Sequence, residues 1–454
     1  MNIYIHVENV VRELDSKILL AILAASRGHQ VIVSNLSSIT RGVALRLLAP
    51  GIFHTKSLTP GEDKILRHQK LIDSGFNVTS IDEEGGLVDY GYDKFAKIRY
   101  SEKTIDQSTA VFGWGVEDTD SLKKIFSKYS SKIYKTGSPR ADLWKPLFYN
   151  YWDIPKEKPS KPYLLISSNL GIVNNKKSVW KLMEQHKNSG YYKRDPELIY
   201  KHLVWVADES RMMSCFIEAI KYLSKNNNLY DIVLRPHPTE NEDMWKIFLD
   251  GIPNVHVIQK GPITNWVVHS FAVLHNGCTT SIEASISGKP VISYVPFKQK
   301  YSRQFANDLG CFVATKEDLL KKINSIYLET QTGNLNNNKI SEKILNKIYL
   351  DDSELAADKI IKVWEGHDNK NFSKVSNWLV FKFFLKIMKL RDLIKMNLLN
   401  FFSKNSFEKN NNKFQPLTEV DICKRIKKIK AILKIEIELD CRLLSDKTIL
   451  IKKK

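Results

Sequence analysis

The chain has 454 residues, of which 43% are hydrophobic and 26% are charged, a composition typical of globular proteins. This composition excludes a disordered, collagen-like or small disulfide-linked chain, and the length suggests two or three domains. The formal net charge is +19, and residues 370–454 hold +13 of it, with 21 Lys and Arg against 8 Asp and Glu. So strong a basic excess indicates an anionic partner, such as lipid headgroups, a phosphorylated substrate or nucleic acid.

The cysteines and the apolar segments favour a cytoplasmic protein. The five cysteines are widely spaced and form no C-x-x-C pair, so we expect neither a zinc site nor a disulfide framework. The short apolar run at residues 3–7 lacks the features of a signal peptide and is typical of a strand. The longest apolar stretch, residues 378–402, carries six charged side chains, so we expect no membrane span.

Strands and helices alternate along the first part of the chain. The strand at residues 3–7 is followed by a helix at 15–26, which Gly28 ends, and by a second strand at 30–33. Further strands are expected at 76–81, 109–112 and 131–134. This alternation predicts a parallel sheet with helices on both faces.

The second part repeats the same alternation after a Pro- and Lys-rich stretch at residues 155–162, which has the composition of a linker. Its strands are expected at 163–167, 231–234, 255–258, 271–274 and 290–294. The sequence therefore predicts an α/β protein with two Rossmann-like domains and a basic, mostly helical extension. The expected boundaries are 1–154, 155–369 and 370–454.

Residues 274–284 are the richest candidate for a ligand site, because a buried strand passes through a glycine turn into a Thr- and Ser-rich helix start. Backbone amides and hydroxyls in such a turn suit a nucleotide phosphate, and Glu283 could accept hydrogen bonds from ribose hydroxyls. The alternative is that residues 279–281 only cap the helix. The candidate donor-binding residues here are Asn276, Gly277, Thr279, Thr280, Ser281 and Glu283.

A second candidate lies at the end of the strand at 231–234, in the sequence Arg235-Pro236-His237-Pro238. Ligands of open parallel sheets bind at the carboxyl ends of the strands, and Arg with His can hold a diphosphate or a departing phosphate. A structural role for a lone histidine is the alternative. We include Arg235, His237 and Pro238 in the donor site, together with Ser167 and Ser168 at the end of the strand at 163–167.

Three carboxylates, Asp82, Glu83 and Glu84, follow the strand at 76–81. Crowded carboxylates raise one another's pKa, so Glu84 or Glu83 is a candidate general base for a sugar hydroxyl. The alternative is a solvated acidic turn. The pair Asp118 and Asp120 has the spacing of a metal–nucleotide site, but we expect it at a helix N-terminus.

The order of these motifs resembles that of GT-B glycosyltransferases, over roughly residues 1–365. The closest resemblance is to bacterial surface-carbohydrate biosynthesis proteins. The sequences E-E-G at 83–85, H-P at 237–238 and T-S at 280–281 also resemble motifs of transferases that use CMP-activated keto-sugar acids such as sialic acid or Kdo. Similar R-P-H-P patterns occur in CDP-glycerol polyol-phosphate transferases, so the donor stays open.

The resemblance implies that a sugar is transferred from a nucleotide-sugar donor to a glycan or lipid-linked acceptor, without a metal ion or a cofactor. The second domain would bind the donor and the first domain the acceptor, and the reaction would take place in the cleft between them. The resemblance also makes Glu84 the candidate base and His237 a donor-phosphate contact. It makes Thr280 and Ser281 a second phosphate contact. The function we expect is thus a glycosyltransferase of surface polysaccharide or lipopolysaccharide biosynthesis. A CDP-polyol phosphotransferase, a sugar-nucleotide epimerase and a non-catalytic scaffold of a polysaccharide assembly complex are the alternatives.

The extension contains a candidate membrane-binding helix at 378–402. Its lysines and asparagines fall on one face at helical spacing and its apolar residues on the rest. The polar face holds Lys382, Lys386, Lys389, Asn397 and Asn400. Such a helix could lie on an anionic inner leaflet, which would make the protein cytoplasmic and peripheral at the inner membrane. The alternative is a helix packed on the protein; no nucleic-acid recognition motif is present, and we expect no nucleic-acid partner.

Overall fold

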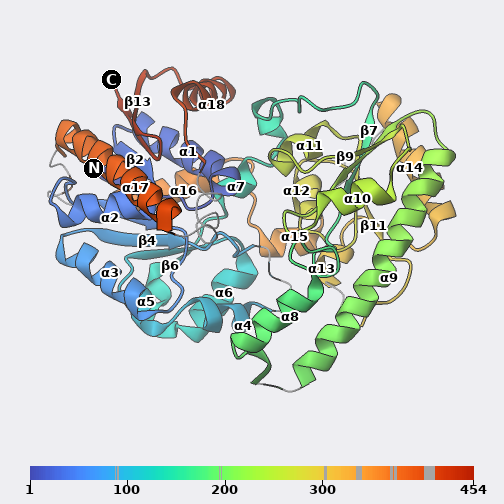
Figure 1. Ribbon diagram of the computed structural model, residues 1–454. Helices are drawn as coiled ribbons and strands as arrows, with labels where there is room; N and C mark the ends of the chain where they lie inside the picture. The colour runs from blue at the N-terminus through green and yellow to red at the C-terminus, as the bar shows by residue number, and fades with distance from the viewer. Residues whose placement is uncertain are drawn as a thin grey trace. The chain divides into compact units, whose positions relative to one another are not determined.

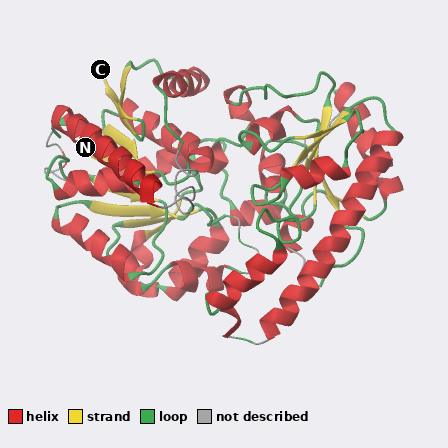
Figure 2. Cartoon of the chain, viewed as in Figure 1, coloured by secondary structure: helices red, strands yellow, loops and turns green. Residues whose placement is uncertain are grey.

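The computed structural model describes residues 1–86, 88, 91–193, 195, 197–300, 304–333, 340–368, 372, 376–402 and 415–454, with the backbone alone for 304 and 395–402. The chain forms two compact units, each described by itself. The first unit consists of Met1–Leu143 and Glu342–Lys454, and the second of Trp144–Ser341. Each unit is a sheet with helices packed on both of its faces (Figure 1, Figure 2).

The first unit contains an eight-stranded sheet in the order β13-β14-β2-β1-β3-β4-β5-β6. Its strands are β1 (Asn2–His6), β2 (Gln30–Ser34), β3 (Ile52–Thr55), β4 (Asn77–Ile81), β5 (Ala110–Gly113), β6 (Ile133–Lys135), β13 (Leu439–Ser445) and β14 (Thr448–Lys453). Strands β1 to β6 pair in parallel, whereas β14 pairs antiparallel with both β2 and β13. The C-terminal hairpin thereby covers the edge of β2, which would otherwise expose unpaired backbone groups.

The helices of the first unit come from both ends of the chain. They are α1 (Val10–Ser26), α2 (Leu36–Ala44), α3 (Glu62–Asp73), α4 (Tyr92–Arg99), α5 (Glu102–Asp106), α6 (Val116–Ile125), α7 (Pro139–Asp142), α15 (Glu342–Lys347), α16 (Ala356–Gly366), α17 (Trp378–Phe402) and α18 (Glu419–Ile432), with a 3-10 helix at Ser127–Lys132. Helix α1 packs against α7, α16 and α18. It is followed by Gly28, whose φ of +91° is left-handed and therefore favours glycine.

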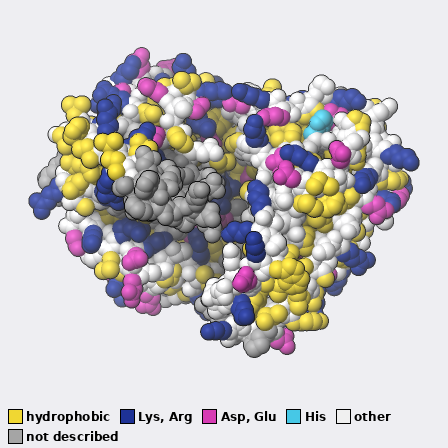
Figure 3. Space-filling view, viewed as in Figure 1, with side chains coloured by type: hydrophobic (Ala, Val, Ile, Leu, Met, Phe, Trp, Pro, Cys, Tyr) yellow, Lys and Arg dark blue, Asp and Glu magenta, His cyan; other side chains and the backbone are white. Residues whose placement is uncertain are grey.

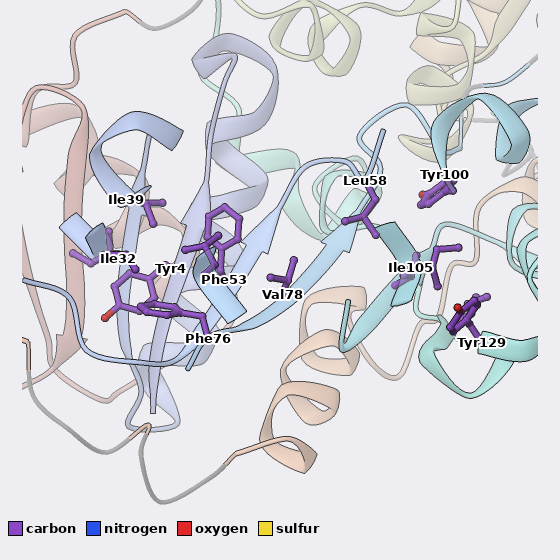
Figure 4. Packing of buried hydrophobic residues seen from close by; sticks show 14 of the residues in the cluster. Tyr4, Ile32, Ile39, Phe53, Leu58, Phe76, Val78, Tyr100, Ile105 and Tyr129 are labelled. Atoms are coloured by element: carbon purple, nitrogen blue, oxygen red, sulfur yellow. The ribbon is translucent and has the colours of Figure 1, made fainter. Parts of the chain in front are cut away.

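A hydrophobic core lies between the sheet of the first unit and the helices on one of its faces (Figure 4). Alternate residues along the strands, including Tyr4, Phe53 and Val78, point into it, as the two-residue period of a strand requires. Phe381 and Leu385 of α17 are buried in this core, and Leu450 of β14 joins it. The C-terminal segment therefore contributes to the same core as the N-terminal strands.

The second unit contains a six-stranded, parallel sheet in the order β12-β11-β10-β7-β8-β9. Its strands are β7 (Tyr163–Ser167), β8 (Asp231–Arg235), β9 (Val255–Val257), β10 (Ala272–His275), β11 (Val291–Tyr294) and β12 (Cys311–Val313). Its helices are α8 (Val179–Asn188), α9 (Glu197–Lys225), α10 (Glu242–Phe248), α11 (Ile263–His269), α12 (Thr280–Ile286), α13 (Gln304–Asn307) and α14 (Lys316–Gln331), with 3-10 helices at Pro146–Tyr151 and Tyr191–Lys193.

Both faces of this second sheet are buried, which explains why its strands appear in the sequence as continuous apolar runs. Leu164 and Ile166 pack on one face with residues of α9, α10 and α14. Tyr163 and Leu165 pack on the other face with residues of α11 and α12.

The prediction of an α/β protein with two Rossmann-like units and a basic, mostly helical extension is confirmed. The division of the chain differs from the expected boundaries in two respects. The first segment ends at Leu143 rather than 154, and residues 342–369, expected in the second domain, belong to the first unit. After the second unit the chain therefore returns to the first one, where the indole nitrogen of Trp364 in α16 donates to the Thr79 hydroxyl of β4 at 3.1 Å.

The C-terminal extension is part of the first unit. Besides its two helices it contains the hairpin β13–β14, which the sequence analysis did not predict. Within the described ranges, no helix combines the length and the apolar character that crossing a bilayer requires.

Candidate functional site

The order of strands in the second unit places a topological switch point between β7 and β10. The chain runs from β7 outward to β8 and β9, and then returns to β10 on the other side of β7. Ligands of such sheets bind outside the carboxyl ends of the strands at this point. Because His275 lies opposite Ser167 in the register, the loops that follow the two strands start side by side. The structure thus brings together two of the predicted segments, 167–168 and 276–281.

Hydrogen bonds tie these two loops together. The Ser167 hydroxyl lies 3.2 Å from both Cys278 Sγ and Thr280 Oγ1. The backbone amide of Asn169 donates to Asn276 Oδ1 at 3.1 Å, and its side-chain amide donates to the Gly277 carbonyl at 3.2 Å.

The turn itself is built largely from internal contacts. Gly277 has a φ of +84°, a left-handed conformation that favours glycine. The Ser281 hydroxyl donates to the Cys278 carbonyl at 2.8 Å, and Thr279 makes no side-chain capping bond. Glu283 accepts from Thr264 at 2.8 Å in a buried position. These side chains thus shape the loop by bonding within the protein. The Ser281 bond is not a helix cap, because its hydroxyl donates to a carbonyl and accepts from no backbone amide of the first turn.

Glu240, which the sequence analysis did not single out, organises the loops after β7 and β8. Its buried carboxylate accepts from the Ser168 hydroxyl at 2.9 Å and from the Leu170 amide at 2.9 Å. It also accepts from the His237 amide at 3.2 Å and the Trp245 indole at 2.7 Å. Burial raises the pKa of Glu240, whereas these bonds lower it. The only signal in the sequence is an acidic residue shortly after R-P-H-P.

Arg235 and His237 have different environments although they are two residues apart. The buried guanidinium of Arg235 donates to the carbonyls of Lys260 and Gly261, and burial lowers the pKa of Arg235 to about 10. Arg235 therefore holds the loop at 260–261. The ring of His237 is bonded through Nδ1, which lies 2.8 Å from Thr239 Oγ1 and accepts from the Thr239 amide at 3.3 Å.

A cavity of about 250 Å³ lies beside the carboxyl ends of β7, β8 and β10 in the second unit. His237 and Asn276, two of the predicted donor-binding residues, line it together with Asn169. Among the described residues the Asn276 amide nitrogen has no hydrogen-bond partner, although the side chain is more than nine-tenths buried. Buried polar groups are normally satisfied, so this nitrogen is a candidate donor to a ligand.

Helices α8 and α9 supply a wall of the cavity that the sequence analysis missed, formed by His186, His202 and Trp205. The rings are neighbours, with centroids 5.3 Å apart for the two histidines and 6.1 Å apart for His202 and Trp205. The Tyr192 hydroxyl contacts His202 Nδ1 at 2.7 Å, and burial lowers the pKa of His202. A neutral imidazole beside an indole offers a stacking surface for a planar ring.

In the acidic turn of the first unit, two of the three carboxylates are buried, and each of the three has a basic partner. Asp82 is buried and accepts from Arg99 at 2.8 and 2.9 Å. Glu83 forms a buried ion pair with Lys17 at 2.5 Å. Glu84 is half exposed and pairs with Arg12 at 2.7 Å.

Two further charged groups lie next to this turn. Glu13 of α1 is fully buried, and both burial and the Glu83 charge raise its pKa. Lys56, which follows β3, pairs with Glu8 and lies 3.9 Å from Glu13. The carboxyl ends of β1, β3 and β4 therefore carry a charged cluster at the switch point of the first sheet, between β1 and β3.

The Asp118–Asp120 spacing belongs to a helix start, as expected. Asp118 lies within the first turn of α6, and its carboxylate accepts from the amides of Trp114 at 2.7 Å and Gly115 at 2.8 Å. Burial raises the pKa of Asp118 to about 7. Within the described part of the chain, no three His, Cys, Asp or Glu side chains are grouped so that they could hold a metal ion.

No protein-family model and no curated protein matches the sequence. Solved structures show distant similarity. The UDP-GlcNAc 2-epimerase from Methanocaldococcus jannaschii is 12% identical with a TM-score of 0.46, over 80% of this chain and 99% of that one. A glycosyltransferase from Rickettsia africae is 15% identical with a TM-score of 0.43, over 80% and 98%. The wall teichoic acid polymerase TagF is 14% identical with a TM-score of 0.39, over 70% and 73%. These values assign the chain to no family and no activity.

Proposed function

We propose that this protein binds a nucleotide-activated sugar through its second unit and transfers the sugar to an acceptor in surface-polysaccharide biosynthesis. The observation that carries the proposal is the cavity at the switch point of the second sheet. It is lined by His237 and Asn276, and the sequence motifs predict both of them as donor-binding residues. Their motifs, R-P-H-P and H-N-G, lie at the ends of different strands, β8 and β10, so their convergence on one cavity is not a consequence of sequence proximity.

The chemistry of the cavity suits the nucleoside part of such a donor. Amide and imidazole N–H groups of Asn276 and His237 can donate to the acceptor atoms of a base or ribose, and Trp205 offers a surface on which a base can stack. The volume of about 250 Å³ lies just below the ~300–1,000 Å³ typical of ligand pockets. It therefore suits a nucleoside better than a complete nucleotide sugar.

Glu84 is the candidate general base of the first unit. Of the two adjacent glutamates, its side chain is 42% exposed and can reach a substrate, whereas that of Glu83 is 5% exposed and paired with Lys17. A base must reach the proton that it abstracts. We therefore propose that Glu84 deprotonates the acceptor hydroxyl and that Glu83 has a structural role.

The test of donor binding is thermal unfolding of the full chain with CMP, CDP, UDP, GDP or dTDP. A nucleotide at 100 times its dissociation constant stabilises the unit that binds it by about 2.7 kcal/mol, which raises its melting temperature by about 5–11 °C. We expect His237→Ala and Asn276→Ala to remove this shift. His256→Ala is the matched control, because His256 lies in β9 and is not among the cavity-lining residues. The absence of a shift with every nucleotide would contradict the proposal.

The identity of the effective nucleotide selects the donor class. CMP would indicate a keto-sugar acid, CDP a polyol phosphate, and UDP, GDP or dTDP a hexose. Turnover of that donor with a glycan acceptor should then fall about 100-fold or more in Glu84→Gln, the usual contribution of a general base. Conversion of the nucleotide sugar without any acceptor would instead indicate an epimerase.

A further inference from the structure

Helix α17 packs on the first unit through one side only. Phe381 and Leu385 are buried in the core, and Trp378 and Phe384 pack partly buried beside them. At about 100° per residue these four side chains fall on one side of the helix. On this side, α17 is packed on the protein, which was the alternative to membrane binding in the sequence analysis.

The opposite side of α17 exposes a continuous apolar stripe. Its residues are spaced by three or four positions and lie within about 80° of one another around the helix. They are Leu379, 82% exposed, Phe383, 64%, Ile387, 51%, Leu390, 59%, and Ile394, 52%. Isolated exposed apolar residues are common, but a stripe of five large ones on a single helix marks an interaction surface.

Basic side chains border this stripe on both sides. Lys382, Lys386 and Lys389 follow one border and Arg391 the other, at the helical angles that their positions dictate. Lys389 is 56% exposed although it also pairs with Asp446 of the hairpin at 3.2 Å. Over this part of the first unit, Figure 3 shows hydrophobic side chains beside lysines and arginines.

This pattern fits a lipid surface better than a protein partner. Long basic side chains beside an apolar stripe can extend to phosphate headgroups while the apolar residues enter the acyl boundary. The segment from residue 370 onward carries 21 Lys and Arg against 8 Asp and Glu, which favours an anionic surface. We propose that the exposed face of α17, from Leu379 to Ile394, binds the surface of a bilayer that contains anionic phospholipids.

The proposal is tested by flotation of the full chain with vesicles of phosphatidylcholine alone or with 30% phosphatidylglycerol. We expect binding to the anionic vesicles and much weaker binding to the neutral ones. The double variant Phe383→Ser/Leu390→Ser should bind the anionic vesicles at least about tenfold more weakly, since it removes two large side chains from the apolar boundary. Lys382→Gln/Lys386→Gln should bind about fivefold more weakly per lysine, and added salt should weaken the wild type similarly.

Leu66→Ser/Ile98→Ser is the matched control, because these side chains are 60% and 54% exposed on α3 and α4 of the same unit. It should bind like the wild type. All variants change exposed residues except Lys382, which is partly buried, and thermal unfolding verifies that they are folded. Equal binding of the Phe383/Leu390 variant and the control would overturn the proposal. A second result would also overturn it: the wild type binds no vesicles and forms a dimer in light scattering, and the Phe383/Leu390 variant is monomeric. The partner of the stripe would then be a second copy of the chain. Nucleotide-induced stabilisation is a separate readout, so failure here leaves the proposed donor site intact.

Discussion

Replacing Lys17 by methionine should destabilise the first unit strongly. Lys17 and Glu83 are 2% and 5% exposed and lie 2.5 Å apart, and removing one partner of a buried ion pair typically costs about 3–5 kcal/mol. We expect the upper part of this range, because Glu13, also fully buried, would be left close to Glu83 with less compensation. Glu83→Gln should destabilise the unit less than Lys17→Met, since the buried Lys17 ammonium still interacts with the carboxylate of Glu13.

The assay is urea unfolding of the full chain, in which the transition of the first unit is assigned by its sensitivity to these variants. With a slope of about 2 kcal/mol/M, a loss of 3–5 kcal/mol lowers the midpoint by about 1.5–2.5 M. Lys124→Met is the matched control, because Lys124 pairs with Asp93 at 3.0 Å on the surface and such pairs contribute about 1 kcal/mol or less. Glu84→Gln should behave like this control.

The pH dependence gives an independent check of the same reasoning. Burial and the Glu83 charge raise the pKa of Glu13 in the folded state, so its contribution to stability is full below its ordinary value of 4.5 and is lost as the pH rises through the folded pKa. Removing the Lys17 charge should raise that pKa further. The deficit of Lys17→Met should therefore shrink between pH 7 and pH 5. If Lys17→Met lowered the urea midpoint at pH 7 by no more than Lys124→Met does, burial of the Lys17–Glu83 pair would not determine its contribution to stability.

Four other changes test the remaining structure. Glu240→Gln should destabilise the second unit by about 2–3 kcal/mol and reduce nucleotide stabilisation, since a carboxylate with four donors becomes an amide with its own N–H groups; thermal unfolding with and without nucleotide measures both effects. Gly277→Ala should cost about 1–2 kcal/mol at its φ of +84°, measured as a urea midpoint. Asp118, whose pKa is raised to about 7, contributes stability that is full below 3.8 and lost as the pH rises through 7, so Asp118→Asn should flatten the decline of the urea midpoint between pH 5 and pH 8. Deletion of 415–454 should expose the edge of β2 and cause aggregation, measured by light scattering.

The central strands could be predicted from the sequence because both of their faces are buried. Val31, Ile32 and Val33 of β2 are all inaccessible, so the apolar run identifies the strand without any knowledge of its neighbours. The short strand β3 was missed, since half of its four residues are His54 and Thr55, whose burial depends on the fold. The hairpin β13–β14 was missed because its mixed polar pattern acquires meaning only once β14 pairs with β2.

The candidate site was predictable in position but not in its internal contacts. Carboxyl ends of parallel strands meet at one edge, so the sequence could place His237 and Asn276 near each other. It could not show that the Arg235 guanidinium donates to carbonyls at 260–261, or that Glu240 gathers four donors, because these contacts depend on loop geometry. The cavity wall from α8 and α9 was missed because His202 and Trp205 lie in an ordinary amphipathic helix pattern.

The C-terminal segment combines an anchored part with an exposed one, and this combination bears on what α17 does. Strand β14 pairs with β2, and the Thr448 and Ser34 hydroxyls lie 2.7 Å apart in a buried contact. Helix α18 buries Ile422 and Ile429 and pairs Arg425 with Asp15 of α1 at 2.7 Å, so this arginine has a structural role. One side of α17 is already buried in the core of the first unit, so the helix is held in place without its exposed stripe. The exposed stripe of α17 is therefore a surface held in place by the fold, and its side chains can be changed without disturbing the contacts that hold the helix.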